Sequence, residues 1–303
     1  MAPEDGLIAI FGPTGVGKTE VAIALARRLR GRGEDPVAIS CDAIAVYRGL
    51  ETISGAPGAD QQGELEHRLV GINDPSEEFS AGRFAELAEA EIAGALSARR
   101  RPIVVGGTGL YMRAALTEID LRPPVAPEVR STVEAELAER GAEALHAELE
   151  ADVRVRIHPK DRKRIARALE LQRSGIDPPE RSRELWTAAL RRPTLLAGIV
   201  SDREQLAERI DRRVEAMAAA GAGEEAKRAK AAGASRTARA ALGFEEFITG
   251  DLDAVKGAHR RYAKRQMSWL RKTPGIAVID RTDLGDAEVA ERIDALLGNT
   301  APR

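Results

Sequence analysis

The architecture of this chain follows from one segment, Phe11-Gly12-Pro13-Thr14-Gly15-Val16-Gly17-Lys18-Thr19. The segment comes directly after a short apolar run, residues 7–10, and before apolar positions spaced as on one face of a helix, up to Leu29. It matches the P-loop pattern G-x-x-x-x-G-K-[ST] in the strand-to-helix context that this pattern requires. A chance glycine-rich turn is the weaker alternative. We therefore expect an α/β fold, a P-loop NTPase-like parallel sheet flanked by helices.

The chemistry of this segment points to a phosphate or diphosphate ligand. Small residues allow consecutive backbone N–H groups to surround an anion, and the following helix N-terminus adds a partial positive charge. Lys18 supplies a full positive charge, and Thr19 offers a hydroxyl to a metal ion, for which we expect Mg²⁺. The pattern alone does not identify the molecule that carries the phosphate, and it does not decide whether ATP binds.

Composition excludes several classes of protein. With 303 residues and a net charge of −2, the chain can bury a large core, and any nucleic-acid binding must come from local basic patches. The single cysteine, Cys41, excludes an internal disulfide and suits a reducing compartment. Residues 1–5 are acidic, unlike a secretory leader, and no apolar run approaches the roughly 18 residues of a membrane span. We expect a cytoplasmic monomer without a membrane partner.

Polar residues follow three predicted strands, residues 36–40, 102–105 and 195–200. The first strand leads to Asp42, the second to Thr108 and the third to Arg203. Ligands in open parallel sheets lie beyond the carboxyl ends of the strands, so these side chains are candidates to reach the ligand of the P-loop. For Asp42, the alternative is a helix N-cap.

The strand before Thr108 ends in two glycines, Gly106 and Gly107. A P-loop NTPase generally has a carboxylate at the end of such a strand, where it holds the water shell of the magnesium ion. The glycines argue against ATP hydrolysis and favour contacts to a ligand through the backbone and the Thr108 hydroxyl.

A change of composition after Leu121 predicts an inserted all-helical domain. We expect the first part of the P-loop core over residues 1–121, the insert over 122–193 and the second part of the core over 194–303. Residues 154–173 carry eight basic residues against two acidic ones, and residues 256–272 carry no acid. Each basic helix is either a solvated face or a nucleic-acid contact. In the second, Tyr262 and Trp269 could stack on bases or pack inward.

Taken together, the segments resemble the bacterial tRNA dimethylallyltransferases (tRNA isopentenyltransferases), in the same order over nearly the whole chain. The P-loop is the first of them, and the others are Ser40-Cys41-Asp42 with Val46-Tyr47-Arg48-Gly49-Leu50, Asp74-Pro75-Ser76, Gly106-Gly107-Thr108-Gly109-Leu110-Tyr111, His158-Pro159-Lys160-Asp161 through Glu170, Asp202-Arg203, and Tyr262 through Arg271.

The resemblance implies transfer of a dimethylallyl group from dimethylallyl diphosphate to the exocyclic amine of the adenosine 3′-adjacent to the anticodon of a tRNA. It implies that the P-loop, with Lys18, Thr108 and Arg203, holds the departing pyrophosphate. Asp42 then acts as the general base.

The resemblance also implies that the tRNA anticodon stem-loop is the macromolecular partner. The residues it assigns to tRNA binding are Asp42, Ala43, Ile44, Ala45, Thr108, Arg130, Lys163, Arg164, Ile165, Ala166, Arg167, Arg260, Arg261, Lys264 and Arg265.

Three segments depart from the family pattern, and one of them, the late Ile-Gly-Tyr-Lys-Glu, reads Leu242-Gly243-Phe244-Glu245-Glu246. The usual Asp-Ser-x-Gln reads Asp42-Ala43-Ile44-Ala45, and a Thr-Ala-Lys-Pro-like segment reads Ser54-Gly55-Ala56-Pro57. These losses leave two alternatives open. One is a P-loop small-molecule transferase, either an adenylate isopentenyltransferase or a kinase. The other is a non-catalytic RNA-binding relative.

Overall fold

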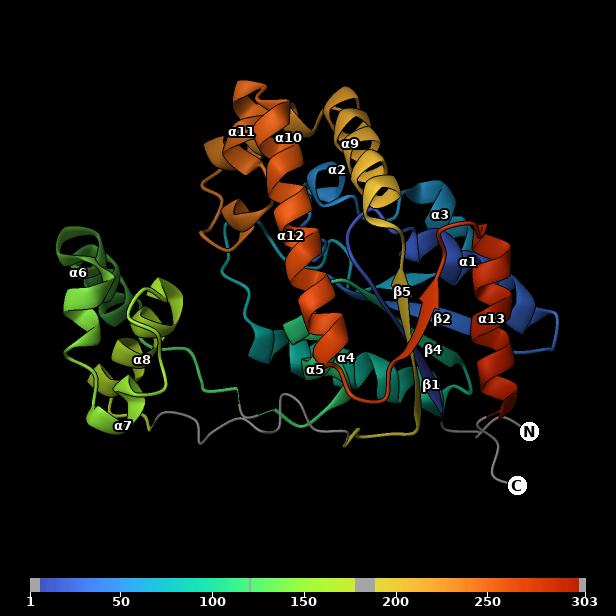
Figure 1. Ribbon diagram of the computed structural model, residues 1–303, viewed down its shortest axis with the longest axis horizontal. Helices are drawn as coiled ribbons and strands as arrows, with labels where there is room; N and C mark the ends of the chain where they lie inside the picture. The colour runs from blue at the N-terminus through green and yellow to red at the C-terminus, as the bar shows by residue number, and fades with distance from the viewer. Residues whose placement is uncertain (1–5, 120, 178–188, 300–303) are drawn as a thin grey trace. The chain divides into compact units, whose positions relative to one another are not determined.

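A computed structural model of the protein describes residues 6–119, 121–177 and 189–299. Its contacts divide the chain into two compact units (Figure 1). The sheet unit comprises Met1–Ile119 and Glu184–Arg303, and the helical unit comprises Asp120–Arg183. The acidic start of the chain and the Pro178-Pro179 pair near the end of the predicted insert lie outside the described residues.

The sheet unit contains a six-stranded parallel sheet, which confirms the predicted fold class. The strand order is β3-β2-β4-β1-β5-β6, so the P-loop leaves the interior of the sheet. The strands are β1 (Leu7–Phe11), β2 (Pro36–Cys41), β3 (His67–Arg68), β4 (Arg101–Gly106), β5 (Thr194–Val200) and β6 (Ala277–Asp280). Every residue of β1 and β2 is buried, as expected for strands covered on both faces.

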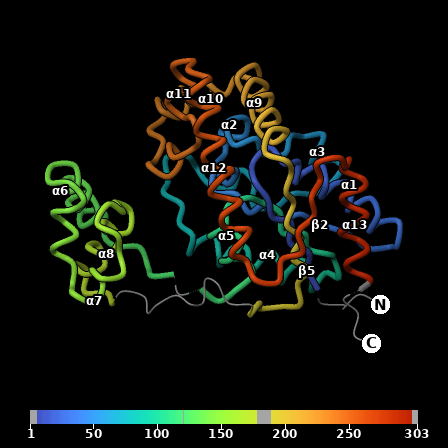
Figure 2. The backbone as a smooth tube through the Cα atoms, viewed as in Figure 1, coloured from blue at the N-terminus to red at the C-terminus, as the bar shows by residue number. Residues whose placement is uncertain are grey.

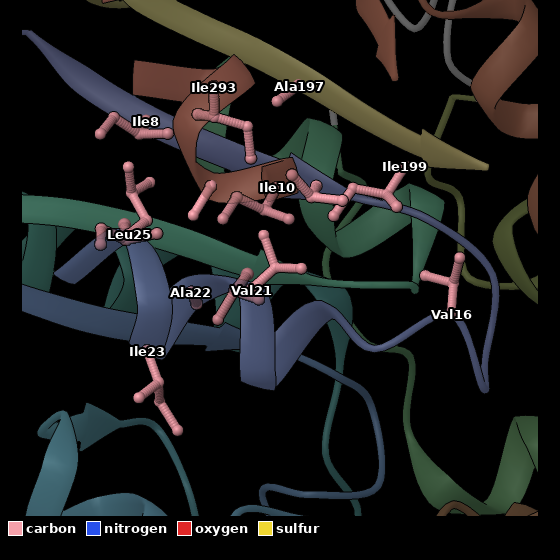
Figure 3. Packing of buried hydrophobic residues seen from close by; sticks show 14 of the residues in the cluster. Ile8, Ile10, Val16, Val21, Ala22, Ile23, Leu25, Ala197, Ile199 and Ile293 are labelled. Carbon is pink, nitrogen blue, oxygen red and sulfur yellow. The ribbon is translucent and has the colours of Figure 1, made fainter. Parts of the chain in front are cut away.

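Helices α1 (Lys18–Arg30) and α13 (Asp286–Asn299) pack side by side on one face of the sheet (Figure 2). Figure 3 shows the core beneath them, where Ile8 and Ile10 of β1 meet Val21, Leu25 and Ile293. Because side chains alternate along a strand, the residues between these isoleucines face the opposite side. There α4 (Ala81–Ser97) and α5 (Gly109–Leu116) cover the sheet.

The remaining helices of the sheet unit gather near the carboxyl ends of the strands. Helix α9 follows β5, and the Asp202 carboxylate caps it by accepting from the backbone N–H groups of Glu204 and Gln205. Helix α12 packs against α5, α9 and α11. These helices are α2 (Glu51–Ser54), α3 (Ala59–Glu64), α9 (Arg203–Ala219), α10 (Ala222–Ala231), η2 (Ala238–Ala240), α11 (Phe244–Thr249) and α12 (Leu252–Lys272).

The helical unit contains α6 (Pro127–His146), α7 (Ala151–Arg154) and α8 (Arg162–Arg173). Its small core joins Val133 and Leu137 of α6 to Ile165 and Leu169 of α8. Gly141 interrupts α6 with a φ of 81°, a conformation that favours glycine. In both units, the helices that the structure describes lack the combination of length and apolarity needed to cross a membrane.

Candidate functional site

The P-loop has a conformation that depends on its glycines. Gly15 and Gly17 have φ values of 79° and 87°, in the left-handed region. Helix α1 begins at Lys18, so the N–H groups of its first turn have no acceptor within the helix and remain available to a ligand. An anion bound here would meet several N–H groups and the positive end of α1.

A cavity of about 470 Å³ lies beside the loop. Its lining residues are Gly15, Gly17, Glu20, Arg209, Arg212 and Arg213. The Arg213 guanidinium donates to the carbonyl oxygens of Ser54 (3.2 Å) and Gly55 (3.3 Å), which ties α9 to α2. One side of the cavity is therefore walled by arginines of α9.

Arg203 does not line this cavity, although we predicted it to reach the P-loop. It is the first residue of α9, where its side chain is exposed. Arg209 and Arg213, six and ten residues further along α9, do line the cavity. Their spacing of four residues puts them on one helix face, which the sequence displays, but nothing in the sequence shows that this face meets the P-loop.

The electrostatics of the cavity favour an anion. Burial and the nearby Arg213 lower the pKa of Lys18 to about 8, although Asp42 and Glu20 act in the opposite direction. Burial also lowers the pKa of Arg213. In the free protein, the lowered pKa values show that the charged forms of these cations are disfavoured. A bound anion favours the charged forms, so these cations and the anion would stabilise each other. Clustered perturbed groups of this kind are typical of functional sites.

Asp42 lies in the turn after β2. Its Oδ1 accepts from the N–H groups of Ile44 (2.8 Å) and Ala45 (3.2 Å). Asp42 therefore has the expected capping role, but it caps a turn and not a helix. No described residue donates to its Oδ2. The capping bonds orient the carboxylate while leaving one oxygen to act on a ligand.

Thr108 lies next to this turn. Its Oγ1 accepts from the N–H of Ala43 (3.4 Å) and is 3.3 Å from the Tyr262 hydroxyl. Burial, followed by the effect of Asp42, raises the pKa of Tyr262 to about 12, so this hydroxyl stays protonated at neutral pH. Gln266 of the same helix accepts from the N–H of Thr14 (2.8 Å) and donates to Gly107 O (2.8 Å). Helix α12 thus joins the P-loop to the Gly106-Gly107-Thr108 segment, a role that the sequence did not predict.

A metal ion would have one candidate ligand in the loop, the Thr19 hydroxyl in the first turn of α1. Among the residues that the structure describes, His, Cys, Asp and Glu side chains form no group of three suited to a metal. Mg²⁺ usually keeps several waters and binds substrate phosphates with few protein ligands. A single hydroxyl beside a diphosphate fits that preference.

Two residues assigned to tRNA binding have buried side chains. Ile165 is 0% exposed in the core of the helical unit, and Ala45 is 3% exposed. The inner face of α8 buries Ile165, whereas Lys163 and Arg164 are exposed. The assignments of Ile165 and Ala45 as side-chain contacts are therefore corrected.

Arg167 and Arg130 make contacts within the helical unit. Arg167 pairs with the buried Glu170 (3.2 Å) and donates to the carbonyl oxygens of Arg122 (3.1 Å) and Pro123 (2.6 Å). Arg130 also approaches Glu170, at 3.7 Å. Both arginines thus support the fold of this unit, whatever else they contact.

On α12, the charged and the aromatic side chains lie on different sides of the helix. Arg261, Lys264 and Arg265 are exposed, and Arg260, also exposed, pairs with Asp211 of α9. The aromatic residues turn inward, Tyr262 toward Thr108 and Trp269 against Gly109, where a Cβ would lie only 2.3 Å from the Trp269 ring. Of the two arrangements considered, inward packing is observed.

Comparisons with known proteins assign the chain to a family. The family model described as "IPP transferase" matches residues 45–273, and the one described as "Isopentenyl transferase" matches residues 5–69. A tRNA dimethylallyltransferase of Anaeromyxobacter dehalogenans is 40% identical over 286 residues, which cover 90% of this chain and 94% of the relative. One of Thioalkalivibrio sulfidiphilus is 37% identical, with coverage of 96% and 94%.

Solved structures give the same result. A tRNA isopentenylpyrophosphate transferase from Bacillus halodurans matches with a TM-score of 0.69 at 31% identity, over 97% of this chain and 96% of that one. A eukaryotic dimethylallyltransferase acting on tRNA has a TM-score of 0.74 at 24% identity, over 96% of this chain and 77% of that one, and so shares the fold. The predicted resemblance is confirmed: the chain belongs to the IPP transferase family.

Proposed function

We propose that the chain transfers the dimethylallyl group of dimethylallyl diphosphate to the exocyclic amine of the adenosine 3′-adjacent to the anticodon in tRNA. The observation that carries this proposal is the position of the P-loop. It borders a cavity lined by Arg209, Arg212 and Arg213 and lies beside the Asp42 carboxylate, in a chain of this family.

The cations would serve the leaving group. As the allylic C–O bond breaks, negative charge grows on the departing diphosphate. The P-loop N–H groups, Lys18, Arg209 and Arg213 surround the place where that charge would develop, and preorganised donors in a partly buried site stabilise it without reorganisation. Thr108 would contribute its hydroxyl. Arg203, exposed at the start of α9, lies outside the lining of this cavity, and its contact with the diphosphate stays a prediction.

Asp42 would serve the acceptor. The amine nitrogen forms a bond to the allylic carbon, the carbon–oxygen bond breaks, and the amine proton passes to the Asp42 carboxylate. The bonds to Ile44 and Ala45 hold Oδ1, which leaves Oδ2 to receive the proton. A positioned carboxylate of this kind typically contributes about 10²- to 10⁴-fold.

Mg²⁺ would be held by the Thr19 hydroxyl together with diphosphate oxygens, and when bound it supplies additional positive charge for the leaving group. The tRNA would meet exposed cations of each unit, Lys163 and Arg164 on α8, and Arg261, Lys264 and Arg265 on α12. We expect a monomer working in the cytoplasm, where tRNA is available.

The test is incubation with tRNA, dimethylallyl diphosphate and Mg²⁺, followed by mass spectrometry of the digested nucleosides. We expect one adenosine per modified tRNA to gain a dimethylallyl group, and RNase mapping should locate it 3′ of the anticodon. Parallel reactions contain AMP in place of tRNA, or ATP in place of the diphosphate. Alkylation of AMP, phosphate transfer from ATP, or tRNA binding without product would each refute the proposal and identify which alternative holds.

A further inference from the structure

Cationic side chains donate to three carbonyl oxygens of the P-loop. Lys18 Nζ donates to Pro13 O (3.0 Å), Arg209 Nε to Gly15 O (3.0 Å) and Arg281 Nη1 to Val16 O (2.7 Å). The first two belong to α1 and α9, beside the cavity. The third comes from the residue after β6, more than 260 positions away in the sequence.

Arg281 contacts the loop beside Gly17 and is not among the residues that line the cavity. Its side chain is 4% exposed. Its Nη1 is 2.3 Å from the point where a Cβ on Gly17 would be, so the guanidinium rests directly on the loop backbone. Asp286 at the start of α13 pairs with its Nη2 at 3.0 Å, and Leu284 O accepts from the same nitrogen at 3.4 Å. The guanidinium is thus fixed from two sides.

The bond to Val16 has a consequence for the next residue. A trans peptide unit is planar, and its C=O and N–H point in opposite directions. Because the Val16 carbonyl points toward the Arg281 guanidinium, the N–H of Gly17 in the same peptide unit points away from it. On that side, the N–H can meet an anion.

We propose that Arg281 is a positioning residue for the diphosphate. It fixes the orientation of the Val16–Gly17 peptide and places a guanidinium beside the loop backbone, without touching the substrate. This inference rests on the proposed function and adds to it that the β6–α13 connection is part of the diphosphate site.

The test measures pyrophosphate binding by calorimetry in Arg281→Gln, Arg281→Lys and the matched control Arg292→Gln, which removes an exposed charge from the same C-terminal segment. The net free energy of a hydrogen bond from a charged group corresponds to roughly 10- to 100-fold in a binding constant. We expect Arg281→Gln to lose pyrophosphate affinity by this factor. Arg281→Lys should recover part of it, and Arg292→Gln should bind like the unchanged protein.

Steady-state kinetics separate positioning from general damage. In Arg281→Gln, the KM for dimethylallyl diphosphate should rise while the KM for tRNA stays the same, whereas a misfolded protein would lose both. If Arg281→Gln does not unfold cooperatively, Arg281→Lys decides, with weaker pyrophosphate binding and unaltered tRNA affinity expected. Unaltered pyrophosphate affinity in the folded variant would overturn the inference even if tRNA is prenylated. Failure of the unchanged protein to prenylate tRNA, with the pyrophosphate effect of Arg281 intact, would refute only the proposed function.

Discussion

Raising the pH should weaken diphosphate capture through Lys18. Burial and the repulsion from Arg213 lower its pKa to about 8 from an ordinary 10.5. The free protein therefore carries the ammonium charge below pH 8 and loses it above. With one proton involved, about a tenth of the molecules keep the charge at pH 9, whereas a lysine of ordinary pKa would remain almost fully charged there. We expect kcat/KM for dimethylallyl diphosphate to fall to about a tenth of its plateau at pH 9.

The assay is kcat/KM for dimethylallyl diphosphate at saturating tRNA, from about pH 6 to pH 10, because this ratio reports groups of the free enzyme. In Lys18→Arg, the guanidinium stays charged throughout, so the decline should disappear even if the plateau is lower. Arg213→Gln removes the second cause of the shift and should move the midpoint upward. A profile for the unchanged protein that stays flat up to about pH 10 would refute the reasoning.

Three further predictions concern other parts of the molecule. Asp42→Asn keeps an Oδ1 acceptor for the turn but cannot take a proton, so turnover should fall at least ~10²-fold with unaltered binding of dimethylallyl diphosphate; near-normal turnover would leave Asp42 only its capping role. The double variant Lys163→Gln/Arg164→Gln should weaken tRNA binding and lower the salt slope by roughly two units. Arg167 is not changed in this variant because its contacts stabilise the helical unit. An unchanged salt slope would show that Lys163 and Arg164 face solvent and do not contact tRNA. His259 is buried, and burial followed by Arg213 lowers its pKa to about 4. At pH values between the folded pKa of His259 and its higher pKa in the unfolded chain, the unfolded chain binds a proton that the folded protein does not. The free energy of unfolding therefore decreases as the pH falls. Urea unfolding should show about 2 kcal/mol less stability at pH 5 than at pH 7 from this group, a loss that His259→Gln should abolish. An identical pH dependence in both proteins would contradict it.

Local sequence determined much of this protein. The strand, loop and helix around Lys18 were predictable because a P-loop needs its residue types at adjacent positions. The cap at Asp202 depends on bonds to N–H groups two and three residues away. The apolar stripe that buries Ile165 and Leu169 follows from helical periodicity. Periodicity predicted little over residues 49–80, where α2, α3 and β3 are too short to show a repeat.

Only the tertiary structure decided which distant side chains complete the site. Arg213, Gln266 and Arg281 reach the P-loop region from α9, α12 and the end of β6, and no local pattern around them shows that they meet the loop. Their roles depend on the strand order, which places β5 beside β1 and β6 beyond it. The strand order depends on how both faces of the sheet pack against helices. The free energy of this packing is a sum over the whole core. No local pattern contains it, so residues close in space can be far apart and unmarked in sequence.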